Sequence, residues 1–375
     1  MSHPHLAFCP YLSMAEAIQF ADWELGPLKA FENRWADQTF KAQSKLFLSK
    51  FVDQSGESIE APTLLCRRGG LIDGALPAAE EVGALEAAIS FAFLEENPRC
   101  TPTSRHHAWK VITADNTDLY FWPIDLDAGQ VTVTTGLMVR TTSGGFRLSD
   151  PELVIRPRLD LHYMRGARTA HAGCLEAMYR TVVESFTAPG TRPAADRLRA
   201  AVGWFVKAWG NTATVHYPER LVFLKTGFEA ITGTSQSWKS AQALRQLFEG
   251  LPNVSPQDSE QLIWSPREQP VHPRTFKIKG QQRTELITDL EVWFMTFADA
   301  RNMIVHDGIA PDLNYTGANP AYSGPLVFTA EFLLRAAIKA SLEGLGHPDL
   351  WRSPLSRAIR TGWAKMNASQ TQPDS

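Results

Sequence analysis

Apolar residues in the second half of the chain recur three and four positions apart, which is the spacing of one face of an α-helix. This pattern predicts five helices, over residues 194–210, 217–232, 236–249, 284–306 and 324–343. A proline-rich loop over residues 251–275 separates the third helix from the fourth, and the other connections are mostly short. Amphipathic helices with short connections are typical of a bundle, so we expect an all-α domain here.

The first half of the chain has a mixed pattern. Residues 14–36, 79–96 and 172–186 are expected to be helical, the second because it is rich in strong helix formers. Four runs of β-branched and aromatic residues are separated by Asp, Asn and Gly, which favour turns. We expect these runs to be strands, at residues 109–112, 119–122, 131–135 and 153–155. The first half is therefore predicted to be α+β, with a small antiparallel sheet.

The clearest boundary is the segment from Thr187 to Pro193, where two prolines and a glycine separate two helical patterns. We therefore expect a mixed α+β domain at residues 1–188 and a helical domain at residues 190–350. A polar C-terminal tail, residues 351–375, is expected to follow.

Composition agrees with two globular domains and narrows the class of protein. The 375 residues are 44% apolar and include 11 Trp and 20 Phe, which is enough for sizeable cores. The net charge of -3 argues against a chain covered in nucleic acid, although it leaves room for a local basic patch. Four scattered cysteines without a CxxC pair indicate reduced thiols. With no secretory signal pattern and no apolar run of about 18 residues, we expect a cytoplasmic protein without a membrane segment.

Candidate chemistry is concentrated in the segment Arg301–Gly308, which reads R-N-M-I-V-H-D-G at the end of the fourth predicted helix. At about 100° per residue, Asn302 and His306 lie on nearly the same helical face, one turn apart. Arg301 flanks them, and Gly308 suits the left-handed position that ends a helix. We expect the three polar side chains to converge in one cleft.

The pattern R-N-x-x-x-H, on a late helix of a helical domain, resembles the signature of the HEPN superfamily (higher eukaryotes and prokaryotes nucleotide-binding). The earlier segment 219–231 is similar to the first-half helix of the Apea-like HEPN group. The resemblance covers about residues 194–345 and does not extend to the first half of the chain. Whether that half acts as a sensor, a substrate selector or a partner-binding domain stays open.

The resemblance implies a metal-independent endoribonuclease that needs no cofactor, in which the neighbouring 2′-hydroxyl attacks the scissile phosphate of RNA. Arg301 would stabilise the phosphorane, because a guanidinium matches two phosphate oxygens. His306 would act as general base or general acid, because an imidazole titrates near neutral pH. Asn302 would orient the histidine or the phosphate.

A homodimer is the expected partner arrangement. HEPN domains resemble one another in pairing two motif helices across a dimer, and one helix end supplies one histidine where the reaction benefits from both an acid and a base. The family setting implies defence against phage or a toxin-like stress response, with a regulatory protein partner left open. Some HEPN toxins carry a tyrosine two residues past the histidine as a modification site. Gly308 stands there, so that regulation is not expected.

Several alternatives stay open or are disfavoured. Many HEPN domains do not cut, so the main alternative is a non-catalytic module that binds RNA, a nucleotide or a protein. Lys277, Lys279 and Arg283 precede the motif helix, and they form either a flexible segment that guides RNA phosphates or an ordinary solvated loop. A metal nuclease is disfavoured, because the chain has no Glu-x-Lys triplet. It also has no phosphate-binding glycine loop and no serine or cysteine nucleophile signature.

Overall fold

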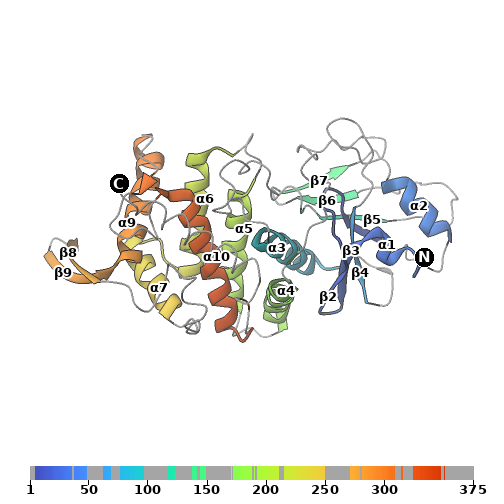
Figure 1. The fold of residues 1–375 in the computed structure, drawn as a ribbon, viewed down its shortest axis with the longest axis horizontal. Coiled ribbons are helices and arrows are strands. Elements are labelled where there is room, and N and C mark those ends of the chain that lie inside the picture. The colour runs from blue at the N-terminus through green and yellow to red at the C-terminus, as the bar shows by residue number, and fades with distance from the viewer. Residues whose placement is uncertain are drawn as a thin grey trace, which may run out of the picture. The chain divides into compact units, whose positions relative to one another are not determined.

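The chain divides into two compact units (Figure 1), with the main change from one to the other between Gly190 and Thr191, while Trp209 and Gly210 group with unit 1. The boundary lies inside the segment where the sequence predicts a linker. In the computed structural model, the residues described are 5–35, 38–48, 62–68, 77–96, 117, 119–123, 137–141, 144–148, 170, 172–187, 190, 192–210, 215–249, 271–278, 281–308, 314–315, 324–347 and 350.

An antiparallel sheet organises unit 1. Its seven described strands are β1 (His5–Cys9), β2 (Ile18–Phe20), β3 (Trp23–Pro27), β4 (Thr63–Arg67), β5 (Leu119–Pro123), β6 (Leu137–Thr141) and β7 (Gly144–Leu148). They lie in the order β2-β3-β4-β1-β5-β6-β7. Strand β1 lies between β4 and β5, since Ala7 pairs with Leu65 on one side and with Phe121 on the other. The predicted antiparallel sheet is therefore confirmed, and so is the strand at residues 119–122. The expected strands at 109–112, 131–135 and 153–155 lie outside the described residues.

The helix expected over residues 14–36 is wrong. Strands β2 and β3 form a tight hairpin there, followed by the short helix α1 (Leu28–Phe31). Phe20 pairs with Trp23, and Ala21 takes a left-handed φ of 45° in the two-residue turn between them. Phe20, Trp23 and Leu25 are all fully buried. Burial against the sheet outweighed the local helical pattern, because tertiary packing readily overrides weak propensity.

Two long helices of unit 1 were predicted correctly. They are α3 (Ala79–Glu96) and α4 (Ala172–Thr187), which pack against each other, and a further helix, α2, spans Gln38–Leu48. The Trp23 indole N–H donates to the Tyr179 hydroxyl at 2.8 Å, and that hydroxyl donates to a Glu81 carboxylate oxygen at 2.9 Å. This chain of hydrogen bonds ties α3 and α4 to the β2–β3 hairpin.

Helices dominate the described part of unit 2. They are α5 (Arg192–Ala208), α6 (Tyr217–Thr232), α7 (Ser237–Glu249), α9 (Asp289–Asn302) and α10 (Leu326–Gly344). Helix α6 packs against α5, α9 and α10, and α9 also packs against α7. Gly227 permits the close approach of α10, because a Cβ at this position would lie 2.6 Å from Leu334 Cδ2. The predicted helices at 194–210, 217–232, 236–249 and 324–343 are confirmed.

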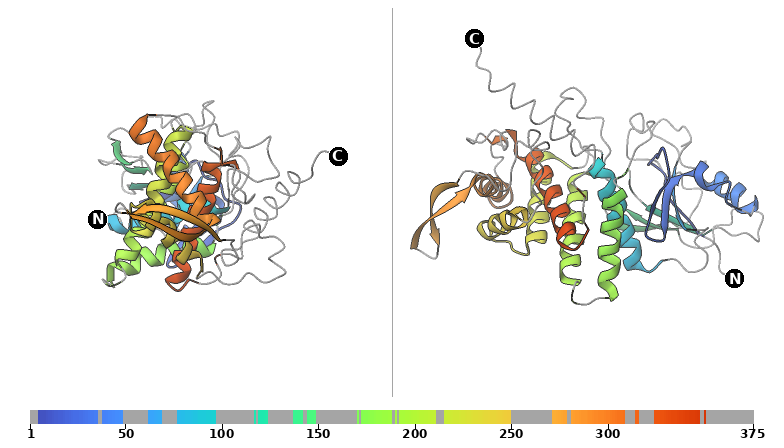
Figure 2. Two further views of the ribbon diagram at one scale, coloured as in Figure 1. Left: turned by 90° about the vertical axis from the view of Figure 1, so that its left-hand side faces the viewer. Right: turned by 60° about the horizontal axis from the view of Figure 1, so that its bottom comes forward.

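The expectation that unit 2 is all-α is wrong. Strands β8 (Val271–Ile278) and β9 (Gln281–Thr288) form a hairpin directly before α9, and β10 (Asn314–Tyr315) pairs with β11 (Gly324–Pro325). Figure 2 shows the β8–β9 hairpin extending away from the helices of this unit. The loop expected over 251–275 is therefore a strand from Val271 onward, and residues 251–270 lie outside the described part.

The motif helix consequently starts later than predicted, at Asp289. Thr288 caps it: its hydroxyl accepts from the Glu291 N–H at 3.3 Å, and its N–H donates to the Glu291 carboxylate at 2.7 Å. Leu286 falls inside the predicted range of this helix, but it lies on β9 and is 62% exposed. On α9 itself, Leu290, Trp293 and Phe297 are buried.

Candidate functional site

The motif lies where α9 ends, and the chain there changes from α-helical to π-helical winding. The π-helix η3 spans Met303–Asp307. Gly308 ends it with a left-handed φ of 64°, and its N–H donates to the carbonyl oxygen of Met303, five residues earlier. The predicted helix-ending role of Gly308 is confirmed.

The π-winding changes how the motif residues are placed around the helix axis. In an α-helix, at about 100° per residue, Arg301 and His306 would lie about 140° apart. A π-helix is bonded from i to i+5 and winds by roughly 80° per residue, which brings these two residues to within roughly 70° of each other. Asn302 and His306 lie within about 40° of each other around the helix axis in either geometry. The sequence prediction put Asn302 and His306 on one face with Arg301 beside them, and the π-winding brings Arg301 and His306 closer together than a continuous α-helix would.

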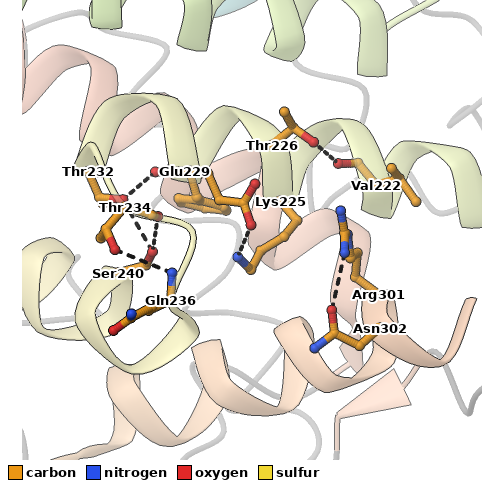
Figure 3. Close-up of polar contacts among 11 residues, drawn as sticks. Val222, Lys225, Thr226, Glu229, Thr232, Thr234, Gln236, Ser240, Arg301 and Asn302 are labelled. Atoms are coloured by element: carbon orange, nitrogen blue, oxygen red, sulfur yellow. Dashed lines mark hydrogen bonds and ion pairs between the residues drawn. The ribbon is translucent and has the colours of Figure 1, made fainter. Parts of the chain in front are cut away.

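Arg301 is the best-defined group of the site. Its Nη1 donates to Asn302 Oδ1 at 3.2 Å, and Figure 3 shows its side chain extending from α9 toward α6. Its Nε is buried without a hydrogen-bond partner. Among the residues that the structure describes, Arg301 makes no ion pair. A buried guanidinium donor without a partner is costly, and an anionic ligand would remove that cost.

His306 has the opposite environment. It is exposed, as are Asp307 and Gly308 after it, while Asn302 is half-buried. Two apolar side chains close to it in the chain are also open to solvent, since Met303 is 36% exposed and Val305 is 46% exposed. One chain therefore presents an arginine, an amide and an accessible imidazole at the end of one helix, with an apolar surface beside them.

Helix α6 contributes a polar pair that the sequence prediction missed. Lys225 is only 2% exposed, and its Nζ lies 2.8 Å from a Glu229 carboxylate oxygen and 5.5 Å from the centre of the Phe294 ring. Phe294 and Arg301 are seven residues apart, so they lie within about 20° of one face of α9. The Lys225–Glu229 pair thus lies in the same α6–α9 interface as Arg301 (Figure 3). The signal available in the sequence was a lysine and a glutamate four apart in a stretch, residues 221–231, whose other residues are mostly apolar.

Two of the three weaker candidates, Lys277 and Arg283, do not lie in the flexible loop that was considered for them. Lys277 lies on β8 and pairs with Gln282, while Arg283 lies on β9 and pairs with Phe276. Lys279 is outside the described residues. Lys277 and Arg283 belong to successive cross-strand pairs of the hairpin. They therefore lie on neighbouring strands but do not face each other directly.

No group of three or more His, Cys, Asp or Glu side chains in the described part of the chain is placed to hold a metal ion. None of its helices combines the length and the apolar character needed to cross a membrane. Comparison with known proteins found that no protein-family model, no curated protein and no solved structure matches the chain.

Proposed function

We propose that this protein is a HEPN-type endoribonuclease, which cuts RNA without a metal through attack of the neighbouring 2′-hydroxyl on the phosphate. The observation that carries the proposal is the pairing, at one helix end, of a partly buried arginine that has a free donor with an accessible histidine. These are the two groups that such a reaction requires, a stabiliser of phosphorane charge and a proton-transfer group.

Arg301 is the group that binds the phosphate in this proposal. Its hydrogen bond to Asn302 holds the guanidinium at one nitrogen, which leaves its other donors for phosphate oxygens. The guanidinium is partly withdrawn from water, which strengthens its interaction with an anion. Asn302 is then an orienting residue for Arg301, a role that differs from the orientation of His306 expected from the resemblance.

His306 is the proton-transfer group, and a second copy of the chain supplies the second histidine. The exposed Met303 and Val305 support a homodimer, because an apolar surface beside the motif favours association and would exclude water from a shared site. The basic residues Lys277, Lys279 and Arg283 guide the RNA backbone toward this site. The biological setting that we propose is phage defence or a toxin-like stress response in the cytoplasm, with unit 1 recognising the trigger or a regulatory protein partner.

A non-catalytic binding module is the second candidate. The same exposed pair, Met303 and Val305, favours it, since an apolar surface around an exposed helix end also suits a protein partner. In that case Arg301 and His306 contribute to recognition only, and no RNA is cut.

Incubation of purified protein with total RNA in EDTA distinguishes the two candidates. The panel is wild type, Arg301→Ala, Asn302→Ala and His306→Ala, with Arg199→Ala on α5 as a matched control because its side chain is 43% exposed and remote in sequence. We expect the wild type and the control to cleave RNA and to leave 2′,3′-cyclic phosphate ends. We expect the Arg301 and His306 variants to lose this cleavage. Cleavage that survives both variants rejects this site, and an inactive wild type favours the binding module.

A further inference from the structure

The π-helix at Met303–Asp307 is not required by the packing of the core. None of its five residues is buried: four are exposed and Ile304 is half-buried, so the interior of unit 2 encloses no side chain of the segment. Ile304 and Val305 are β-branched, which lowers their preference for the α-helix. A π-turn is less favourable than continued α-helix and occurs frequently at functional sites. A rare geometry in an exposed segment points to a role outside the core.

The π-turn changes the angle between Arg301 and His306, which are the two residues that the proposed reaction needs on a common face. It reduces the angle between Arg301 and His306 from about 140° to roughly 70°, while it leaves Asn302 and His306 close to one face. Arg301 itself belongs to α9 and is held by Asn302, so the π-turn moves the histidine and not the arginine.

We infer that Met303, Ile304 and Val305 are positioning residues, whose π-winding carries His306 round to the side of the helix that presents Arg301. This inference rests on the proposed ribonuclease function. The inference gives a geometric reason for the spacing of the motif, in which four residues separate the arginine from the histidine. The five steps from Arg301 to His306 are close to one turn of a π-helix, but they exceed one turn of an α-helix.

A helical phase scan tests the inference. Deletion of Ile304 leaves four steps between Arg301 and the histidine, which an α-turn spans with an angle of about 40°. Insertion of one alanine between Ile304 and Val305 instead rotates the histidine by about a further 80–100°, away from the arginine. Insertion of one alanine directly after Gly308 is the matched control, because it lengthens the chain just past the motif and leaves the bond from the Gly308 N–H to the Met303 carbonyl, and the phase of His306, unchanged.

The quantities to compare are kcat and KM for RNA cleavage, together with the affinity for an oligonucleotide that carries 2′-deoxy at the scissile position. We expect the deletion and the control insertion to keep kcat within about tenfold of wild type. We expect the insertion before Val305 to lower kcat by about 100-fold or more, the range of a lost acid or base, with KM and oligonucleotide affinity unchanged.

Each other outcome counts against the inference. The inference is overturned if the deletion lowers kcat by about 100-fold while the control remains active. It is also overturned if the variant with the insertion before Val305 remains active. Thermal unfolding of all three variants should match wild type, and a variant that unfolds early shows that the segment is structural and also overturns it. An inactive wild type overturns both the inference and the proposed function, whereas an active wild type with the wrong phase dependence overturns the inference alone.

Discussion

Arg301 donates a hydrogen bond from Nη1 to the amide oxygen of Asn302, the next residue in the chain, at 3.2 Å. The bond is neutral on the acceptor side, so it orients the guanidinium without cancelling its charge. A carboxylate in the same place would hold the arginine more tightly and neutralise it, because charge-assisted hydrogen bonds are about twice as strong as neutral ones. The choice of an amide therefore keeps Arg301 available to an anion.

Asn302→Asp should consequently be more harmful than Asn302→Ala. We expect the alanine variant to lose about tenfold in the rate of RNA cleavage and the aspartate variant to lose about 100-fold or more, since an ion pair then occupies Arg301. Single-turnover cleavage and affinity for a non-cleavable oligonucleotide measure the two effects. Equal losses in both variants would show that Asn302 acts in some way other than through the charge of Arg301.

The exposed apolar pair beside His306 is predicted to hold two copies of the chain together. Met303→Ser with Val305→Ser should convert the proposed dimer to a monomer and abolish cleavage, because each copy then lacks its partner histidine. Light scattering coupled to size-exclusion chromatography reads the mass, and thermal unfolding checks that the folded chain is intact, as expected for surface substitutions.

Leu345 offers the control for that experiment. It is 37% exposed, close to the exposure of Met303, and follows α10 rather than the motif. Leu345→Ser should leave mass and activity unchanged. A wild type that is monomeric at micromolar concentration yet cleaves RNA would rule out the composite site.

The buried ion pair of α6 yields a prediction about stability. Lys225→Met leaves Glu229 without its partner at an interface, and we expect it to cost about 1–3 kcal/mol, less than for a fully buried pair because Glu229 is 23% exposed. The double variant Lys225→Met with Glu229→Leu removes both charges and should return to within about 1 kcal/mol of wild type. Urea unfolding followed by circular dichroism compares them. A double variant as unstable as the single one would mean that the lysine contributes through contacts other than the pair.

The sheet of unit 1 carries an acid-sensitive contact. Arg34 donates from both terminal nitrogens to the buried Glu24, at 2.6 and 2.8 Å. This hydrogen bonding is the main cause that lowers the pKa of Glu24 below its ordinary value, and burial opposes it. Because the folded pKa is the lower one, the stabilisation is complete above the ordinary pKa and is lost as the pH falls through the folded value.

Glu24→Gln should therefore lower the melting temperature most at neutral pH, and the difference from wild type should shrink as the pH falls from 7 toward 3. Glu16→Gln, at an exposed glutamate nearby in the chain, is the control and should show no such trend. A difference that stays constant with pH would mean that the contact does not depend on the charge of Glu24.

Much of unit 2 was readable from the sequence because its helices carry their own periodic signal. Helices α5, α6, α7 and α10 lie within a few residues of the predicted ranges, as do α3 and α4 of unit 1. Turn chemistry was also local, so the left-handed Gly308 could be predicted from its place after the last apolar residue. The motif residues Arg301, Asn302 and His306 could be named for the same reason, since their spacing is visible in the chain.

The errors arose where distant contacts decide the local structure. Residues 18–27 form a hairpin because Phe20, Trp23 and Leu25 find a buried sheet to join, and residues 281–288 form a strand because β8 pairs with them. Neither partner is visible in a short window of sequence. The buried Lys225–Glu229 pair was missed because only packing turns an ordinary helical ion pair into one at an interface.

By itself, the sequence determined which residues are available for chemistry at the end of α9, and that a glycine would end the helix there, because both depend on neighbours along the chain. The tertiary structure decided how those residues are presented. Burial of the Arg301 Nε and the exposure of His306 depend on what packs around the helix end. The π-turn sets the angle between Arg301 and His306. The pattern of apolar positions does not reveal the free-energy difference between its i to i+5 hydrogen bonds and those of an α-helix.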